Sequence, residues 1–385
     1  MASPPQSTPP KSSMRADARR FWQRVTEGME TRQLWSQFQK DARSSYRLYS
    51  AGLAEGAEGR GFHRWWAVAK ALFWAIIEKL SPARRVLLLL ALILLFAPSG
   101  GFTYKDAAGE VRVGEFDLHI WGGLLMFLVL LLELADRVVM KRDLEIAKDI
   151  QAWLLPGAPL QIPGYQLAYA TRAANTVAGD YYDVILRPGK TPNEDRILFV
   201  VADVAGKSMP AAMLMATFQA SLRTLSTSGA ALAELVAGVN RYACSNSMGG
   251  VRFTTAFLAE LDPATGDILY VNAGHNVPIL RKKSGVMERL ETGGLPVGIF
   301  AETPYQVGTT RLEGGDWLVI FTDGLVEAVN AKNEEYDEPA LIRLVDRESG
   351  RSPAEMLDIL LAELDRHVGN TPQHDDITCL LLKRS

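Results

Sequence analysis

The chain has 385 residues, of which 48% are hydrophobic and 22% charged, with a net charge of −3 and two cysteines. Cys244 and Cys379 lie far apart in the sequence, so they argue against a disulfide framework or a zinc site and fit buried thiols in a reducing cytosol. The length leaves room for one large domain and a smaller part.

The N-terminal region is basic and has two parts. Residues 1–14 are rich in proline and serine, which predicts disorder. Residues 15–80 are expected to form a cytoplasmic helical, juxtamembrane region. Its last stretch, 65–80, suits both a helix on the membrane surface and a helix packed on another helix. Residues 1–85 carry 15 Lys and Arg against 7 Asp and Glu, which suits anionic lipid headgroups.

Two apolar runs predict a transmembrane hairpin within 81–135, with spans at about 86–102 and 118–135. Two arginines precede the first run and three basic residues follow the second, whereas the loop between them has two basic and four acidic residues. Basic residues that flank membrane spans are retained on the cytoplasmic side, so both termini and the C-terminal domain are expected in the cytoplasm. The alternative is a buried hairpin of core helices.

Residues 136–156 predict a linker helix that ends at Pro156, which cannot continue it. Apolar residues recur on this helix with 4-3 spacing, which favours a short coiled coil and a homodimer through 136–154. An amphipathic helix packed on its own domain fits the pattern equally well. The seam positions are Met140, Leu144, Ala147, Gln151 and Leu154.

The remaining residues, 157–385, alternate strand and helix patterns, which predicts an α+β sandwich of two antiparallel sheets with helices outside. Strands are expected at 166–172, 181–186, 196–204, 254–261, 268–272, 277–281, 305–312, 317–322 and 377–383. Helices are expected at 208–227, 230–247, 337–346 and 353–368.

Four aspartates stand at the ends of strand-like runs: Asp180, Asp203, Asp323 and Asp375. Any one alone is most simply a turn aspartate beside glycine. Four converging carboxylates with no matching basic cluster would repel one another, and a divalent cation is the natural compensation. Ligation by oxygen alone favours Mg²⁺ or Mn²⁺ over zinc. The pattern therefore indicates a two-metal hydrolase.

Seven segments in order resemble one family. They are LEIAKDIQAWLLP (144–156), GDYYD (179–183), DVAGKSMPAA (203–212), FTTAF (253–257), NAGHNVP (272–278), TDGLVEA (322–328) and DDIT (375–378). From about residue 144 to the C-terminus the chain resembles the metal-dependent protein phosphatases (PPM), in their SpoIIE/RsbU-like branch. The resemblance implies a PPM-type αββα sandwich.

The resemblance also implies a site with two Mn²⁺ or Mg²⁺ ions. The expected catalytic residues are Asp180, Asp203, Asp323 and Asp375, and the expected metal ligands are these four with the Val204 carbonyl and Asp376. Asp203 would bridge the ions, Asp180 and Val204 would hold one of them, and Asp323 and Asp375 the other. Asp375 is favoured over its neighbour because the family pattern is ligand, Asp or Asn, hydrophobe, Ser or Thr.

Five further positions qualify this assignment. Ala178 and Ser208 stand where the family usually has glycine, and neither change removes a ligand. Ala205 stands where eukaryotic relatives carry a histidine that acts as general acid. Asp183 is a candidate helper ligand or supporting acid, and His275 a candidate base, although a histidine in a turn between strands is more often structural.

The implied function is a phosphoserine/phosphothreonine phosphatase anchored in the cytoplasmic membrane. In this branch the substrate is usually a phosphorylated anti-sigma-factor antagonist, a small STAS domain. The alternative is a non-catalytic membrane scaffold with a degenerate phosphatase fold. Residues 136–385 carry 24 Lys and Arg against 32 Asp and Glu, which argues against a nucleic-acid partner.

Overall fold

The computed structural model describes residues 74, 77, 79–98, 100–105, 111–157, 159–189, 194–246 and 252–385. They belong to two compact units, Met1–Ala135 and Asp136–Ser385. The expected disordered segment 1–14 and nearly all of the expected helical region 15–80 lie outside the described residues.

In the first unit a helix is followed by a β-hairpin and then by the start of a long helix. These elements are α4 (Pro82–Phe96), β1 (Gly100–Lys105), β2 (Val111–Phe116) and α5 (Leu118–Leu154). Strands β1 and β2 pair antiparallel. The hairpin was not predicted, because its apolar alternation is short, with Phe102 and Tyr104 in one strand and Val111 and Val113 in the other. Among the described residues, no other strand joins this two-stranded sheet.

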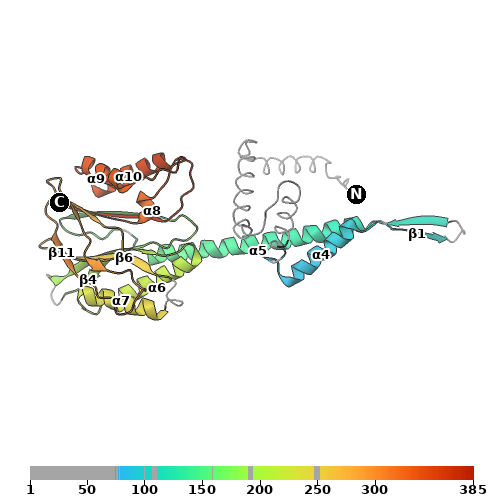
Figure 1. The fold of residues 1–385 in the computed structure, drawn as a ribbon, viewed down its shortest axis with the longest axis horizontal. Helices are drawn as coiled ribbons and strands as arrows, with labels where there is room; N and C mark the ends of the chain where they lie inside the picture. Colours follow the sequence, from blue (N-terminus) through green and yellow to red (C-terminus); the bar gives the residue numbers. More distant parts are fainter. Residues whose placement is uncertain are drawn as a thin grey trace, which may run out of the picture. The chain divides into compact units, whose positions relative to one another are not determined.

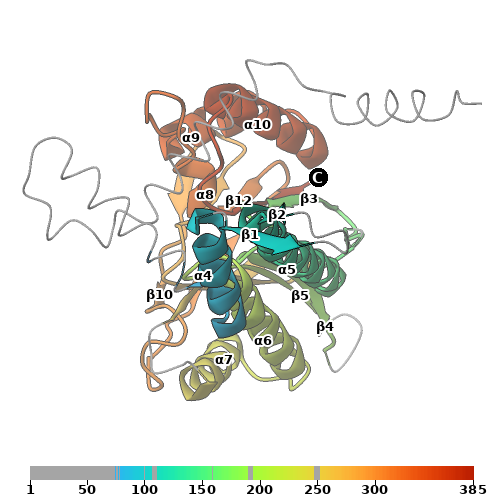
Figure 2. The same cartoon turned by 90° about the vertical axis from the view of Figure 1, so that its right-hand side faces the viewer.

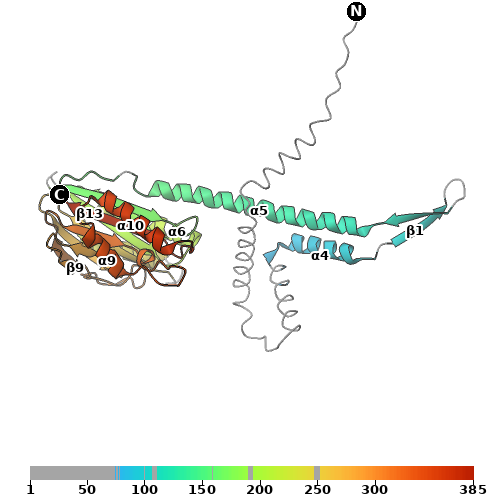
Figure 3. The same cartoon turned by 90° about the horizontal axis from the view of Figure 1, so that it is seen from above.

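Helices α4 and α5 pack side by side in opposite directions (Figure 3). Near the start of α4, Arg84 Nη1 lies 3.3 Å from Glu133 Oε2 of α5. Toward the end of α4, a Cβ added to Gly122 would lie 2.7 Å from Leu95 N and 2.9 Å from Ala91 O. Gly122 therefore allows the two backbones to approach closely, and a larger residue there would force them apart.

The expected extension of the first apolar segment to residue 102 is wrong. Helix α4 ends at Phe96, and residues 100–105 form a strand instead. Pro98 explains the stop, because it has no N–H to continue the helical ladder. The second expected segment, 118–135, lies inside the 37-residue helix α5. Among the described residues, α5 is the one helix long and apolar enough to cross a membrane, judged by length and composition.

The second unit contains two sheets whose strands come from distant parts of the chain. The six-stranded sheet has the order β10-β7-β6-β5-β4, with β11 paired to β7, and the five-stranded sheet has the order β3-β13-β12-β8-β9. The strands are β3 (Tyr165–Arg172), β4 (Tyr181–Arg187), β5 (Arg196–Val204), β6 (Thr254–Leu261), β7 (Asp267–Ala273), β8 (Ile279–Arg281), β9 (Met287–Arg289), β10 (Gly293–Gly294), β11 (Gly308–Arg311), β12 (Trp317–Phe321) and β13 (Ile377–Arg384). All ladders are antiparallel except the short β10–β7 pair.

Helices cover the outer face of each sheet (Figures 1 and 2). Two helices lie against the six-stranded sheet and two against the other, with a short helix after β12. The expected α+β sandwich with helices outside is confirmed. The helices are α6 (Met209–Ser226), α7 (Leu232–Asn246), α8 (Asp323–Val326), α9 (Glu338–Arg347) and α10 (Pro353–Val368).

Strand β5 shows why the central strands read as continuous apolar runs. Val200 and Ala202 pack in the core shared with α6 and α7, whereas Phe199 and Val201 pack in the core between the sheets. A strand buried on both faces needs apolar residues at every position. At its end Asp203 interrupts this run, and a carboxylate there is costly unless it is compensated.

The C-terminal part of α5 packs on its own unit. The Gln151 side chain is buried and bonds Ala178 in both directions, donating to its carbonyl at 2.7 Å and accepting from its N–H at 2.9 Å. Gln219 of α6 donates to the Leu154 carbonyl at 3.3 Å. Gln151 therefore cannot lie in a seam with a second copy, and that position of the predicted coiled coil is wrong.

Candidate metal centre

The four predicted aspartates lie at one end of the sandwich, where strands of both sheets begin or end. Asp180 directly precedes β4 and Asp203 is the penultimate residue of β5; these strands pair, with Tyr181 opposite Ala202. Asp323 follows β12 and Asp375 precedes β13, which pair with Phe321 opposite Cys379. The topology thus brings two acids from each sheet to the same edge.

Asp180 is the most enclosed of the four, with 2% of its surface exposed. The Thr322 hydroxyl donates a hydrogen bond of 2.9 Å to its Oδ2. Burial raises the pKa of Asp180 well above its usual value, and the nearby Asp203 raises it further. Hydrogen bonds from Thr378 and Thr322 offset part of this rise.

Asp203 and Asp323 experience the same two effects. Burial and then the neighbouring carboxylates, with Asp323 first and Asp375 next, raise the pKa of Asp203 to about 7. Burial and Asp375 likewise raise the pKa of Asp323, although Lys207 counteracts this in part. A carboxylate pKa rises in this way when like charges share a poorly solvated space. The acids therefore lie near enough for their charges to raise one another's pKa, as in the effect of Asp323 and Asp375 on Asp203.

Asp375 and Asp376 have different partners. Asp375 Oδ2 lies 3.0 Å from Lys207 Nζ in an accessible ion pair. Asp376 is buried, and its two oxygens accept hydrogen bonds from the Ala174 N–H at 2.7 Å and the Gly179 N–H at 2.5 Å. Asp376 therefore holds the turn that presents Asp180, and the carboxylate left for a ligand is that of Asp375.

Two motif glycines allow the close backbone approach at this edge. A Cβ on Gly324 would lie 2.0 Å from the Asp376 carbonyl oxygen. A Cβ on Gly179 would lie 3.1 Å from the Val204 carbonyl oxygen, which places that predicted ligand beside the Asp180 turn. Since neither backbone oxygen can retreat easily, a side chain at Gly324 would displace the Asp375–Asp376 segment.

The acids are not gathered into a finished coordination sphere. Within the described ranges, no three His, Cys, Asp or Glu side chains are positioned to hold one metal ion. Electrostatic repulsion reaches farther than a metal–oxygen bond of about 2.0–2.6 Å. The acids can therefore raise one another's pKa without lying close enough to share one ion. The donors suit Mg²⁺ or Mn²⁺ chemically, because they are all oxygens. Burial and then neighbouring negative charge raise the pKa of Asp180, Asp203 and Asp323. A cation here would replace the Lys207–Asp375 ion pair.

Asp183 does not belong to this group, and its proposed role as a helper ligand is wrong. It is fully buried and paired with Arg223 of α6, whose Nε lies 2.7 Å from Oδ2 and whose Nη2 lies 2.8 Å from Oδ1. The Tyr181 hydroxyl and the Val184 N–H also donate to it. Residues 180 and 183 point to opposite faces of the strand, because side chains alternate.

His275 has structural contacts, as expected for a turn histidine. Its ring Nδ1 lies 3.1 Å from the Thr255 hydroxyl, and its backbone N–H donates to Asn272 Oδ1 at 2.7 Å. Burial lowers the pKa of His275 to about 4, because the charged imidazolium would be desolvated. The ring is therefore neutral at physiological pH.

Three residues of the site were missed from the sequence. Thr322 is central, because its hydroxyl donates to Asp180 and accepts from the Thr378 N–H at 2.9 Å. Lys207 supplies the cation beside Asp375. The three residues, Thr322, Thr378 and Lys207, stand inside the segments TDGLVEA, DDIT and DVAGKSMPAA, so the signal was present but was assigned to the acids alone.

The unusual Ser208 leads to a stability prediction. Its backbone has φ 65° and ψ −154°, a region that favours glycine, the residue expected at this position by the family pattern. Ser208→Gly should therefore raise the free energy of unfolding by about 1 kcal/mol, measured by urea denaturation. Ser284→Gly is the control, since Ser284 is exposed and has negative φ. Equal effects at both positions would show that Ser208 carries no strain.

The family comparison agrees with this architecture. The model of stage II sporulation protein E (SpoIIE) matches residues 193–385, half of the chain. The SiaA-PP2C domain of Pseudomonas aeruginosa has the same fold, with a TM-score of 0.58, 18% identity, and coverage of 65% of this chain and 99% of that domain.

Curated relatives extend the similarity into α5. Phosphoserine phosphatase RsbU of Bacillus subtilis is 27% identical over 245 residues, which are 63% of this chain and 70% of that protein. Protein IcfG of Synechocystis is 26% identical over 274 residues, which are 64% of this chain but only 42% of that longer protein. With the family match covering half of its length, the chain belongs to the SpoIIE family of PPM-type phosphatase domains.

Proposed function

We propose that the protein is a metal-dependent phosphatase that hydrolyses phosphoserine or phosphothreonine on a protein substrate. The observation that carries this proposal is that Asp180 and Asp203 of one sheet and Asp323 and Asp375 of the other meet at the same end of the sandwich. Burial first, and neighbouring carboxylates next, raise the pKa of Asp180, Asp203 and Asp323 there. Such a cluster is suited to divalent cations. RsbU, a relative that shares this region, is named a phosphoserine phosphatase.

In the proposed site, Asp180, Asp203 and the Val204 carbonyl would hold one cation, and Asp203, Asp323 and Asp375 would hold the other. When bound, two such ions supply a nucleophilic water at neutral pH and positive charge for the phosphoryl oxygens. The Thr322 hydroxyl fixes the orientation of the Asp180 carboxylate.

The protein's own residues set the proton path. Ala205 has no ionisable side chain to protonate the leaving serine oxygen, so that proton comes from water. Lys207 adds a further positive charge beside Asp375. Freed from this ion pair, its ammonium group can approach an anionic substrate.

The proposed substrate is a phosphorylated STAS-type anti-sigma-factor antagonist, by resemblance to the SpoIIE/RsbU-like branch. The alternative is a non-catalytic scaffold with a degenerate site. All four acids and the Thr322 hydroxyl that supports them are present, which favours the enzyme.

The test is hydrolysis of p-nitrophenyl phosphate and of a phosphoserine peptide by the full chain in detergent micelles. We expect turnover with Mn²⁺ or Mg²⁺ and none in excess EDTA. A phosphotyrosine peptide should be a poorer substrate. Full activity in EDTA contradicts the metal site, and absence of turnover with either ion supports the scaffold.

Membrane anchoring through α4 and α5 is also part of the proposal. Large apolar side chains on both helices are exposed, among them Ile93 at 65%, Phe96 at 80% and Phe127 at 57%. Such side chains suit lipid contact. The 15-residue helix α4 is roughly 22 Å long, below a typical hydrocarbon core of about 30 Å. Local thinning of the bilayer, or the residues that flank α4, would have to compensate for this difference in length.

The topology prediction follows from the distribution of basic residues. A reporter inserted after Gly101 should report the outside, and one at the C-terminus the cytoplasm. Alkaline phosphatase and green fluorescent protein fusions at both positions measure this. A cytoplasmic location at both positions would mean that the hairpin does not span the membrane.

A homodimer through 136–154 is proposed with a corrected seam. Val138 and Met140 are exposed on this helix, and four further exposed apolar side chains recur with 7-4-3 spacing on a face away from the buried Gln151: Val139, Ile146, Ile150 and Trp153. Trp153 is 84% exposed. This spacing suits a coiled-coil partner of the same sequence.

Ile146→Glu should shift residues 136–385, a compact unit, from dimer to monomer. Sedimentation equilibrium measures the dissociation constant, which should rise at least about tenfold because a charge replaces a buried contact. Lys148→Glu, at an exposed polar position, is the control. If the native protein is a monomer, the proposed dimer is wrong and the helix only connects the two units.

A further inference from the structure

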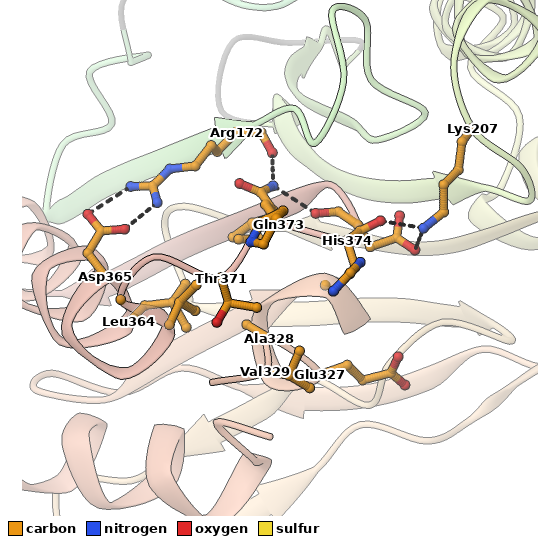
Figure 4. Close-up of a pocket in the computed structure, with 16 residues that line it drawn as sticks. Arg172, Lys207, Glu327, Ala328, Val329, Leu364, Asp365, Thr371, Gln373 and His374 are labelled. Carbon is orange, nitrogen blue, oxygen red and sulfur yellow. Dashed lines mark hydrogen bonds and ion pairs between the residues drawn. The ribbon is translucent and has the colours of Figure 1, made fainter. Parts of the chain in front are cut away.

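A cavity of about 430 Å³ opens beside the candidate metal centre. Lys207, Gly324 and Asp375 belong to both, so the two sites are continuous (Figure 4). The cavity lies between the turn after α8 and the segment that joins α10 to β13. Its volume suits one long side chain or a small group of atoms rather than a folded domain.

The two cations that line the cavity already have partners. Arg172 forms a two-pronged pair with Asp365, at 2.5 Å for Nη1–Oδ1 and 3.3 Å for Nη2–Oδ2. Lys207 pairs with Asp375 at 3.0 Å. Both pairs are drawn in Figure 4. As long as Lys207 stays paired with Asp375, neither basic side chain leaves an unmatched positive charge in the lining.

Glu327 is the acid of the cavity lining that is not paired with Arg172 or Lys207. It is exposed at the cavity wall, and within the described part of the chain its carboxylate has no hydrogen bond or ion pair. In Figure 4 this carboxylate lies on the side of Lys207 and His374, away from the Arg172–Asp365 pair. Its pKa is raised by burial and by the charges of Asp323, Glu335 and Asp375. Glu327 therefore offers an unpaired carboxylate to a cation at this wall.

The rest of the wall is partly apolar. Leu364 and Ile377 are buried with 1% and 3% of their surface exposed, and Val329 and Val368 are half-buried beside them. A long aliphatic stem can pack on these groups while its charged end reaches Glu327. Arginine and lysine combine such a stem with a cationic head.

We propose that this cavity binds an arginine or lysine side chain of the phosphoprotein substrate, near its phosphoserine in sequence. The cationic head pairs with Glu327, and the stem packs on Leu364 and Ile377. Because the cavity shares Lys207 and Asp375 with the metal centre, only a few residues of extended substrate, about 3.3–3.6 Å each, separate the two side chains. The proposal rests on the proposed phosphatase function and adds a sequence preference to it.

The experiment compares phosphoserine peptides that carry Arg, Ala or Glu at one position, moved in turn along each side of the phosphoserine. The full chain in detergent micelles with Mn²⁺ is the enzyme. At one position the Arg peptide should have a KM about three- to tenfold lower than the Ala peptide, as expected for a partly exposed ion pair. The readout is the ratio of kcat/KM for the Arg peptide to that for the Ala peptide. Because both values are measured on the same variant, the ratio does not depend on that variant's overall activity.

Charge changes at Glu327 make the test specific. Glu327→Gln should bring the Arg/Ala ratio to about one, and Glu327→Lys should make the Glu peptide the better substrate. Glu302→Gln, at an exposed glutamate outside the cavity, should keep the native ratio.

Two failures can be told apart. Hydrolysis of every peptide with no preference for Arg, or a native preference for Glu, overturns the basic-residue site and leaves the phosphatase intact. A native ratio that persists in Glu327→Gln also overturns it. No hydrolysis of any peptide or of p-nitrophenyl phosphate contradicts the proposed function itself.

Discussion

Asp203→Asn is expected to lower kcat for phosphate-ester hydrolysis about a thousandfold, which corresponds to about 4 kcal/mol of lost transition-state stabilisation. The substitution removes the carboxylate that is proposed to serve both ions. Asp183→Asn should cost far less, because Asp183 pairs with Arg223 on the other face of β4. The measurement is kcat at saturating Mn²⁺ with p-nitrophenyl phosphate. Equal losses in the two variants would contradict the assignment.

The same substitution should stabilise the metal-free fold. Neighbouring acids and burial raise the pKa of Asp203 to about 7, above an unfolded value of about 3.9, so ionisation at neutral pH favours unfolding. In EDTA, the stability contributed by this group is therefore present below about pH 4 and is lost as the pH rises through about 7. Asp203→Asn should raise the free energy of unfolding at pH 7.5 by about 1–3 kcal/mol. A destabilised variant would mean that Asp203 is compensated by some other group.

Arg223→Met is expected to lower the free energy of unfolding by about 3 kcal/mol. Asp183 has no exposed surface, and the methionine would leave its carboxylate with only the Tyr181 hydroxyl and the Val184 N–H. Removing one partner of a buried pair is costly because the remaining charge stays desolvated.

Urea denaturation of residues 136–385, followed by circular dichroism, measures this loss. Arg241→Met is the matched control, because Arg241 is an exposed arginine of the neighbouring helix α7. The control should change stability by about 0.5 kcal/mol or less. A similarly small change in Arg223→Met would show that the Asp183 pair contributes nothing to stability.

The strands of the sandwich could be predicted because the central ones are buried on both faces. The predicted strand at 196–204 matches β5, and the predicted helix at 353–368 matches α10. Helix α10 also has clear boundary signals, with a Ser352–Glu355 capping box at its start and Gly369 at its end. The site acids could be predicted for a related reason, since a carboxylate that ends an apolar strand is conspicuous.

Other features depend on contacts that the sequence pattern does not contain. The apolar alternation of the β1–β2 hairpin is too short to reveal it, with two alternating apolar residues in each strand. The burial of Gln151 depends on the backbone of Ala178, 27 residues away, so spacing along α5 alone suggested the wrong seam. The position of Asp183, in contrast, could have been predicted from the sequence, because strand alternation alone places it on the face opposite Asp180.

The acids of the two sheets are expected to bind divalent cations together. Isothermal titration of Mn²⁺ into residues 136–385 measures this binding, in parallel with Asp203→Asn and Asp183→Asn. We expect two ions to bind to the native protein, at least one to be lost in Asp203→Asn, and native binding in Asp183→Asn. Absence of Mn²⁺ binding, or equal binding in all three proteins, would contradict this expectation.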